Sequence, residues 1–218
     1  MGYTSRQVDQ DSAHRNAAGN VAAFARHFLQ ARLAGFEKDL AICLTPIQSS
    51  TRRGLTHAYF PALSACFGFL EYLAGLHRGN LTGIGWVQVA NWADRFLPQP
   101  DYNRELVRIL FSAFRHSVAH RGIATGVWVD RSKTPHLRVT WRVLADVRRP
   151  ACKLIGERGT LKRDPPWPCP YTHRMQIHLK ALQSDLAEGV LNYIAAVEID
   201  KKLQSNFEAC MRQLYPVG

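Results

Sequence analysis

Apolar residues recur every three or four positions through most of the chain, a spacing that places them on one face of an α-helix. Four such stretches precede residue 122 and a fifth closes the chain. Their apolar positions are Val21, Phe24, Phe28, Phe36, Leu40 and Leu44; Phe60, Leu63, Phe67, Leu70 and Ala74; Trp86, Val89, Ala90, Ala93 and Phe96; Val107, Leu110, Phe111, Phe114 and Val118; and Leu186, Val190, Ile194, Val197, Leu203, Phe207 and Leu214. The pattern predicts four to five helices, of which the last is long.

Several residues predict where these helices begin, bend and end. Gly35 is expected to bend the first helix and Pro46 to end it. Pro61 lies in the first turn of the second, where proline is tolerated. Asp101 and Ser184 are candidate N-caps of the fourth and last helices, because a short polar side chain accepts hydrogen bonds from free helix-end amides.

Between the fourth and last helices the period changes to two. Residues 137 to 143 alternate between apolar and polar side chains, which predicts a half-buried strand. Val127 and Val129 indicate its hairpin partner, and Met175 and Ile177 suggest a third short strand that includes Leu179. The stretch 150–170 is rich in proline and charge and is predicted to be a mobile loop.

We therefore expect one mainly α domain over 1–218, built as an up-down helical bundle with a small antiparallel sheet inserted before the last helix. Its expected parts follow the chain in order. They are a polar tail at 1–15, helices at 16–122, a basic β-hairpin and Pro-rich loop at 123–180, and a C-terminal helix at 181–218.

The end of the fourth helix carries the most informative residues of the chain. Arg115, His116 and His120 lie within a few positions of one another, and Gly122 can stop the helix after them. Arginine is permanently cationic and binds phosphate through a planar fork. Histidine is the side chain best suited to move protons near neutral pH. A site that cleaves a phosphodiester without a metal needs both abilities.

Helical geometry places this motif on a polar face. At 100° per residue the apolar positions of the fourth helix share one arc. The other side holds Arg108, Ser112, Arg115, His116 and His120. Arg115 and His120 are about 140° apart, but a long arginine can reach a phosphate held near His120. Ile109 is expected to be exposed on this polar arc and to help bury a dimer interface.

At Arg115, His116 and His120 the sequence resembles the HEPN superfamily, the higher eukaryotes and prokaryotes nucleotide-binding domain. Its ribonuclease members carry an arginine, often a polar residue, a few spacers and a histidine. The resemblance covers roughly 16–122 and the C-terminal helix. It implies a HEPN-like bundle, no cofactor, and a metal-independent endoribonuclease that cleaves RNA by attack of the 2′-hydroxyl.

The same resemblance implies roles and partners. His120 would handle a proton at the 2′-hydroxyl or the leaving oxygen, while Arg115 would stabilise charge on the phosphate. His116 would be a second polar group that positions the phosphate or one of the other two residues. Family members often pair two motif helices in a homodimer. Many are toxins or defence effectors restrained by an antitoxin such as a minimal nucleotidyltransferase. Further candidate contacts to the RNA are Arg108, Ser112, Arg121, Arg138 and Arg142.

The distribution of charge supports a polyanionic ligand. The chain carries a formal net charge of +11. Residues 131–180 hold 12 Lys and Arg against 3 Asp and Glu, so most of the excess follows the motif directly. Such clustering is the electrostatic signature of a nucleic-acid binder, although a solvated basic surface has the same composition.

Other sites have weaker support. His116 and His120 have the spacing of two metal ligands on one helix, but no glutamate lies between them in the metalloprotease arrangement and no third ligand is evident. A zinc site from Cys152, Cys169, His173 and His178 has loose spacing, and we expect no metal. The chain has no GxGxxG, P-loop or GxSxG motif, which excludes nucleotide and hydrolase sites of those types.

The sequence favours a cytoplasmic protein. The first 16 residues lack the apolar core of a signal peptide. The longest apolar stretch, 62–76, is too short to span a bilayer and contains Glu71, so no membrane partner is expected. Five cysteines at irregular spacing suggest no disulfide framework.

Two functions remain open alongside a structural explanation. The first is the endoribonuclease. The second is a noncatalytic RNA- or nucleotide-binding HEPN module that keeps the motif for binding or folding. In the structural explanation Arg115 and His120 only pair with the helix C-terminus, whose partial negative charge favours cations.

Overall fold

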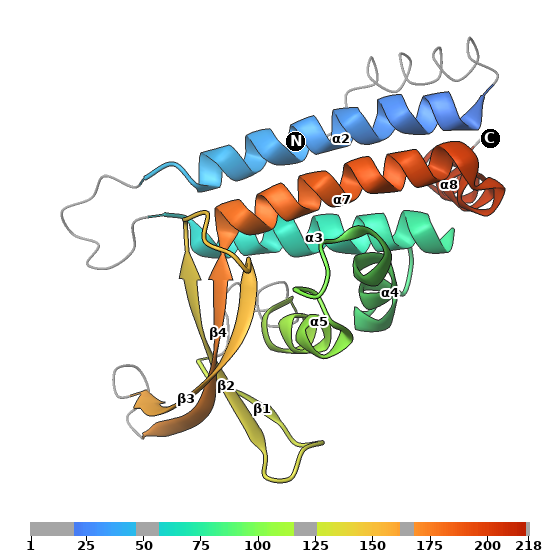
Figure 1. Ribbon diagram of the computed structural model, residues 1–218. Helices are drawn as coiled ribbons and strands as arrows, with labels where there is room; N and C mark the ends of the chain where they lie inside the picture. Colours follow the sequence, from blue (N-terminus) through green and yellow to red (C-terminus); the bar gives the residue numbers. More distant parts are fainter. Residues whose placement is uncertain (1–19, 47–56, 116–125, 162–167, 217–218) are drawn as a thin grey trace.

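The helices form the larger of two parts of the molecule (Figure 1). A computed structural model describes residues 20–46, 57–115, 126–161 and 168–216. Within these ranges the α-helices are α2 (Val21–Cys43), α3 (Tyr59–Arg78), α4 (Trp86–Phe96), α5 (Arg104–Leu110), α7 (Leu179–Ile199) and α8 (Lys201–Leu214). The long helices α2, α7 and α3 lie side by side, with α4 and α5 beneath them on one side (Figure 1).

Most of the apolar positions read from the sequence form the core of this helical part, but Leu214 is exposed, and the side chains of Phe114 and Val118 lie outside the described residues. Phe28 of α2 and Phe207 of α8 are fully buried, with ring centroids 5.8 Å apart in an edge-to-face arrangement. Asn20 caps α2 by accepting a hydrogen bond from the amide of Ala22. The helix then continues through Gly35 without a break and ends before Pro46.

The apolar helix α3 is part of this core. It is long and apolar enough to cross a membrane by length and composition, but half of its most apolar window is buried inside the fold. Leu63, Leu73 and Leu76 are fully buried. The apolar character of α3 therefore agrees with its place in the core of the fold.

The predicted long last helix is in fact two. Asp200 separates α7 from α8 with an extended backbone, and its carboxylate accepts hydrogen bonds from the amides of Lys202 and Leu203. Arg95 of α4 donates to the same carboxylate at 3.1 Å. The apolar period continues across the break because both helices face the core, so the sequence pattern conceals it.

Two predicted N-caps are also wrong. Asn103, not Asp101, caps α5, since its side chain accepts from the amide of Leu106 at 2.9 Å. The last helix starts at Leu179, so Ser184 lies inside it. The first correction moves a helix start by two residues, and the second adds six residues to the start of the last helix.

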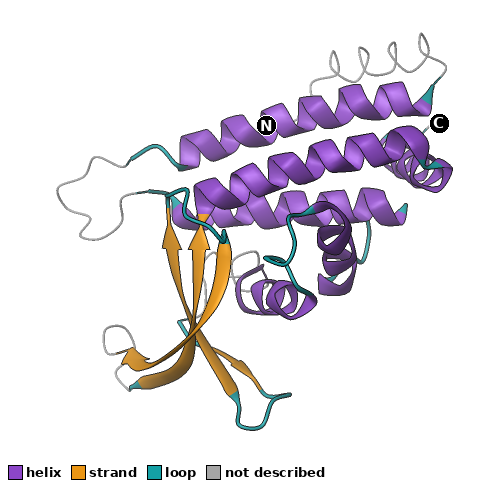
Figure 2. Ribbon diagram, in the orientation of Figure 1, coloured by secondary structure: helices purple, strands orange, loops and turns teal. Residues whose placement is uncertain are grey.

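Four described strands between α5 and α7 form one sheet (Figure 2). Its strands are β1 (Trp128–Asp130), β2 (Leu137–Leu144), β3 (Cys152–Leu161) and β4 (Cys169–His178), in the order β1-β2-β4-β3. The pairs β1–β2 and β3–β4 are antiparallel, whereas β2 and β4 are parallel. The predicted strand at 137–143 and its hairpin partner are confirmed.

The sheet corrects the predicted fold class. The expected mainly α, HEPN-like up-down bundle with a small antiparallel sheet is replaced by a mixed four-stranded sheet beside the helices. The error lies in the stretch expected to be a mobile loop, because it contains β3 and the start of β4. The residues of β3 do not alternate clearly and include Gly156 and Gly159, so neither pattern nor propensity marks the strand.

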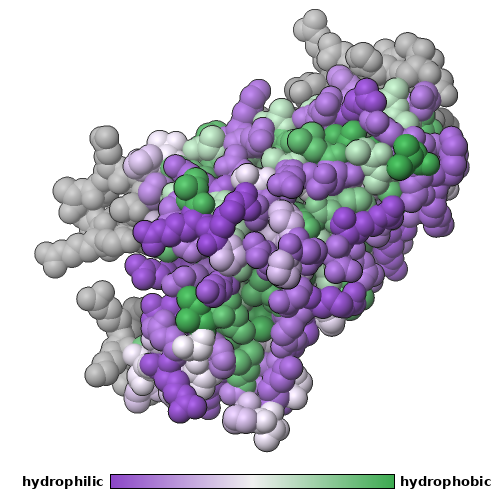
Figure 3. Space-filling view, in the orientation of Figure 1, coloured by the Kyte–Doolittle hydropathy of each residue, from purple (hydrophilic) through white to green (hydrophobic). Residues whose placement is uncertain are grey.

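Large hydrophobic residues are exposed singly over the described surface. They are Ile42, Val87, Val147, Leu191, Ile199 and Leu214. Figure 3 shows hydrophilic side chains over most of one face, with hydrophobic residues in separate patches. Scattered exposure of this kind is normal for a globular protein.

Gly159 lies where β3 and β4 shift register, and it provides a test of the sheet. A Cβ at this position would lie 2.4 Å from the hydroxyl oxygen of Tyr171, whose side chain is buried and bonded to Arg174. We expect Gly159→Ala to lower the free energy of unfolding by about 1–3 kcal/mol through overpacking.

Gly156→Ala on the same strand is the matched control, because nothing lies within 4 Å of its added Cβ. It should be neutral or slightly stabilising, since alanine restricts the unfolded chain. Urea unfolding of both variants measures the difference. Equal stabilities would show that Tyr171 does not pack against Gly159 as described.

Candidate functional site

The helix of the Arg-His motif changes geometry before it reaches the motif. After α5 the chain continues as a π-helical turn, η1 (Phe111–Arg115). A π-helical turn forms i→i+5 hydrogen bonds and therefore shifts the phase of later side chains relative to an α-helix. The 100° spacing that placed Ser112 and Arg115 relative to the apolar positions of α5 does not hold through this turn. Such turns occur often at functional sites.

The motif itself is described only in part. The backbone of Arg115 belongs to η1, but its side chain, together with His116, His120 and Arg121, lies outside the described residues. Ser112, a predicted RNA contact, is half-buried in η1. Ile109 is fully buried, so its expected role in an exposed interface is wrong.

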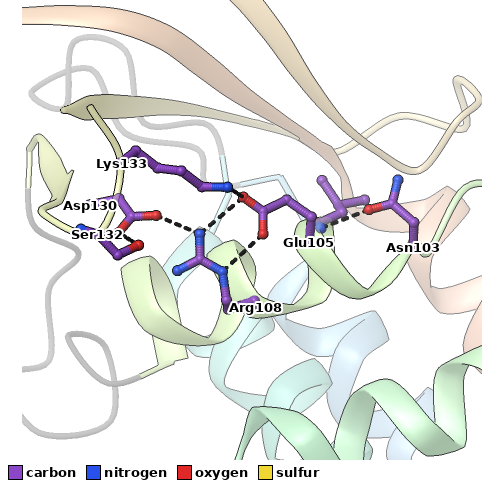
Figure 4. Close-up of polar contacts among 7 residues, drawn as sticks. Asn103, Glu105, Arg108, Asp130, Ser132 and Lys133 are labelled. Atoms are coloured by element: carbon purple, nitrogen blue, oxygen red, sulfur yellow. Dashed lines mark hydrogen bonds and ion pairs between the residues drawn. The ribbon is translucent and has the colours of Figure 1, made fainter. Parts of the chain in front are cut away.

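A polar cluster fastens α5 to the β1–β2 hairpin (Figure 4). Arg108 donates to both carboxylate oxygens of Glu105 at 3.0 Å and to Asp130 at 2.5 Å. Asp130 also accepts hydrogen bonds from the hydroxyl and amide of Ser132, and Lys133 lies 3.3 Å from Glu105. Arg108 was predicted to bind RNA, but two carboxylates already occupy its guanidinium. Its geometry is that of a residue that positions the hairpin.

Hydrogen bonds and ion pairs within this cluster stabilise the charged forms of its side chains. Burial acts to raise the pKa of Asp130, but hydrogen bonds from Arg108 and Ser132 outweigh it and lower that pKa to about 2. The hydrogen bond from Arg108 also lowers the pKa of Glu105. Bonds to Glu105 and Asp130 raise the pKa of Arg108. The cluster is therefore fully charged at neutral pH.

The two faces of the sheet differ in chemistry. One face packs on the helices through buried side chains, which are Val139, Val143, Cys152, Met175 and Ile177. Trp141 lies on this face and contacts Phe60 of α3, with ring centroids 5.4 Å apart. Because side chains alternate along a strand, Arg138 and Arg142 lie on the opposite face, which we call the open face. Their predicted position on one strand face is confirmed.

Cross-strand register places further polar residues beside Arg142. Gln176 of β4 pairs with Arg142 on one side and with Lys153 of β3 on the other. Two strand spacings put the Cα atoms of Arg142 and Lys153 about 10 Å apart. Neither cation forms an ion pair with any residue in the described ranges. The row therefore carries two unneutralised positive charges.

A cavity of about 310 Å³ lies at the end of the open face where α7 begins. Its charged and titratable lining residues are Arg142, Arg148, Arg149, Lys153, Asp146 and His178. Arg149 pairs with the buried Asp185, and Arg148 lies 3.5 Å from Asp146. Four cations against one carboxylate make the lining positive.

His178 is fixed at the wall of this cavity. Its side chain is 7% exposed, and Nδ1 is hydrogen-bonded to the carboxylate of Asp146. Its amide donates to the carbonyl of Ala151 at 2.8 Å, and the carbonyl of Asp146 accepts from the amides of Lys180 and Ala181 at the start of α7. With Nδ1 bonded to the carboxylate, Nε2 is the nitrogen left to meet a ligand.

The hydrogen bond between His178 and Asp146 also favours the ionised form of Asp146. Partial burial raises the pKa of Asp146, but the hydrogen bond from His178 and the nearby Arg148 lower it below its ordinary value. Asp146 and His178 are 32 positions apart, and no sequence motif joins them. The only sequence signal for this site was the basic stretch that contains it.

The structure separates the predicted RNA contacts into two groups. Arg108 and Ser112 belong to α5 and η1, on the helical side of the sheet, whereas Arg138 and Arg142 are on the open face. The conceivable zinc ligands Cys152 and Cys169 lie at opposite ends of the β3–β4 pair. In the described part of the chain no three His, Cys, Asp or Glu side chains are grouped to hold a metal.

No protein-family model, no curated protein and no solved structure matches this chain.

Proposed function

We propose that this protein is a cytoplasmic RNA-binding protein that contacts the phosphate backbone with the open face of its sheet. The observation that supports it is the row of cations at Arg142 and Lys153, which have no acidic partner among the described residues and are continued along β2 by Arg138. Arg138 and Arg142 are four residues apart on one strand, so they span about 13 Å. A surface of this length suits several phosphates of one strand better than a single small anion.

A second function, cleavage of the bound RNA, is favoured by the π-helical turn that ends at Arg115. In this proposal Arg115, His116 and His120 form a metal-independent endoribonuclease site of the kind suggested by the HEPN resemblance. A homodimer and restraint by a minimal nucleotidyltransferase are parts of the same proposal. The buried Ile109 contributes nothing to that dimer, so its interface would need other residues.

The sheet constrains how the two functions combine. The helix α5 is bonded to the hairpin through Asp130, while Arg142 faces away from the helices. An RNA on the open face would therefore reach the motif around an edge of the sheet. In this arrangement the Arg108–Asp130 contact matters because it fixes the hairpin relative to the motif helix.

Salt dependence tests the proposed RNA contacts. Phosphate contacts release counterions, so RNA affinity should fall steeply as salt rises. Replacing both Arg138 and Arg142 by Gln removes two charges and should reduce the slope of log K against log salt by about 1.4 for single-stranded RNA. Fluorescence anisotropy with a labelled RNA between 50 and 300 mM salt, concentrations typical of such titrations, measures the slope.

Lys202→Gln is the matched control, because Lys202 is an exposed cation on α8, beyond the far end of α7. It should leave the slope close to that of the unmodified protein. Two results would show that the open face is only a solvated basic surface. One is an RNA affinity that does not change with salt concentration. The other is a slope of log K against log salt that Lys202→Gln and the double variant change equally.

A further inference from the structure

The cavity at the end of the open face differs from the rest of that face in one respect. Along β2 the cations Arg138 and Arg142 form a row on one strand face, whereas at the cavity the cations surround a space of about 310 Å³. A volume of this size is at the lower end for small-molecule sites. It is large enough for a phosphate group with part of an attached sugar.

Three donors converge on this space. Arg142 and Lys153 flank Gln176, and His178 lies two residues further along the same strand, about 7 Å away on the same face. Arginine presents a planar fork and lysine a compact charge, while His178 as an imidazolium donates Nδ1–H to Asp146 and presents Nε2–H to the phosphate. Donors on three sides can surround the terminal oxygens of a phosphate, which a single row of cations cannot do.

The cavity also fixes its donors in advance. Asp146 orients the imidazole of His178 through Nδ1, and backbone bonds from Asp146 to the first turn of α7 hold the loop that carries it. Arg149, by contrast, is bonded to Asp185 and Ser184. Its guanidinium therefore adds to the positive electrostatic potential of the cavity more than it contacts the ligand directly. A preorganised set of donors recognises a compact dianion with little loss of side-chain freedom.

We propose that this cavity binds a phosphomonoester, and that its source is the terminal phosphate of the RNA bound on the open face. A terminal phosphate carries a second negative charge that an internal phosphodiester lacks, and the net positive lining favours that extra charge. The RNA source rests on the proposed function, because the RNA must first lie on the open face. A free mononucleotide offers the same phosphomonoester chemistry and is separated from an RNA end by the test.

The test compares RNA ends. The affinities of one short labelled RNA are measured by anisotropy with a 5′-phosphate, with a 3′-phosphate and with hydroxyls at both ends, and AMP is titrated separately by calorimetry. We expect one phosphorylated end to bind about tenfold more tightly than the hydroxyl form, the size of one added charge-assisted contact. Lys153→Gln and His178→Gln should reduce this ratio to about one.

Arg138→Gln is the control, since Arg138 shares the open face but does not line the cavity. It should weaken all three RNAs and leave the ratio unchanged. Because His178 is buried, thermal unfolding must show that His178→Gln is folded; the exposed Lys153 gives a variant that carries no such risk.

The outcomes separate the two proposals. Salt-dependent binding of all three RNAs with equal affinity would overturn the cavity proposal and leave RNA binding intact. Binding of AMP that depends on Lys153 and His178, with no affinity for any RNA, would support the phosphomonoester site while overturning its RNA source and the proposed function. Binding of neither AMP nor a phosphorylated end in preference to a hydroxyl end would remove the site altogether.

Discussion

Replacing His120 with Ala should slow the proposed cleavage of RNA about 10³-fold, while RNA binding is retained. A general acid or base placed at the 2′-hydroxyl or the leaving oxygen contributes roughly 10²–10⁴-fold. Arg115→Ala should cause a loss of about 10²–10³-fold, because it removes stabilisation of charge on the phosphate oxygens. Cleavage of a structured RNA, followed on denaturing gels, measures both.

The proposed cleavage mechanism predicts two further results. Cleavage by direct attack of the 2′-hydroxyl yields a cyclic phosphate end, and it should continue in the presence of a chelator. Arg138→Gln serves as the control, since it lies on the open face and should weaken binding without changing the rate at saturating RNA. Cleavage that stops on chelation would identify a metal nuclease, and no cleavage of any RNA would leave the noncatalytic binding module.

Mixing the two inactive variants tests whether the site is shared between protomers. If two motifs meet across a twofold axis, heterodimers of Arg115→Ala and His120→Ala contain one site with both residues intact on opposite chains. Partial activity in the mixture is then expected. A mixture as inactive as its components, in a protein shown to be dimeric by sedimentation, would mean that each motif acts alone.

The helical part of the fold follows closely from the sequence, and the reason is visible in particular residues. Phe28, Leu63, Val89 and Phe207 lie at helical spacing and are all buried. Periodicity reports which face of a helix meets the core, and it does so reliably when the element is long. It does not report interruptions such as Asp200, because residues on both sides of the break keep the same core-facing period.

The sheet could be predicted from periodicity only in part. The strand at 137–143 alternates because its apolar residues face the helices while Arg138 and Arg142 lie on the other face, so its pattern is clear. In β3 the partly buried Leu154 and Ile155 are neighbours, and two glycines interrupt the pattern. That strand forms because β4 supplies its hydrogen-bonding partner, which is a property of tertiary structure. A mixed topology with β4 parallel to β2 depends on the same long-range pairing.

The residues of the candidate site were also predictable from the sequence only in part. The basic stretch after the motif could be seen in the sequence, and Arg142 was identified from strand alternation. Lys153 and His178 were not assigned to the site, because they join Arg142 only through the register of three strands. Arg108 was assigned to RNA because it lies on the polar arc of the helix, and no local pattern shows that Asp130, 22 positions later, pairs with it.

Replacing Asp130 with Ala should lower the free energy of unfolding by about 3 kcal/mol, the largest effect that we expect on stability. Asp130 is 5% exposed on its side chain and accepts hydrogen bonds from Arg108 and Ser132, so its loss leaves a partly buried guanidinium with one carboxylate fewer. Removing one partner of a buried ion pair typically costs about 3–5 kcal/mol. Glu105 remains bonded to Arg108, which places the expected value at the lower end.

Glu157→Ala is the control for loss of an acidic partner, because its pair with Arg174 is more exposed, with side chains 40% and 25% accessible. It should cost less than about 1 kcal/mol. Denaturant unfolding at pH 7 compares the two variants. Equal losses would show that the α5–hairpin contact is no stronger than a surface ion pair.

The lowered pKa of Asp130 also predicts how the stability of the fold depends on pH. The pKa of Asp130 is about 2 in the folded protein, held down by Arg108 and Ser132 against the effect of burial, and 3.8 is its ordinary value. A lowered folded pKa means that the unfolded chain binds the proton more readily, so Asp130 stabilises the fold above about pH 4. That contribution, about 2 kcal/mol, should be lost as pH falls from about 4 to about 2. Subtracting the pH profile of Asp130→Asn from that of the unmodified protein isolates it, and a flat difference across this range would show that Asp130 is not held by Arg108.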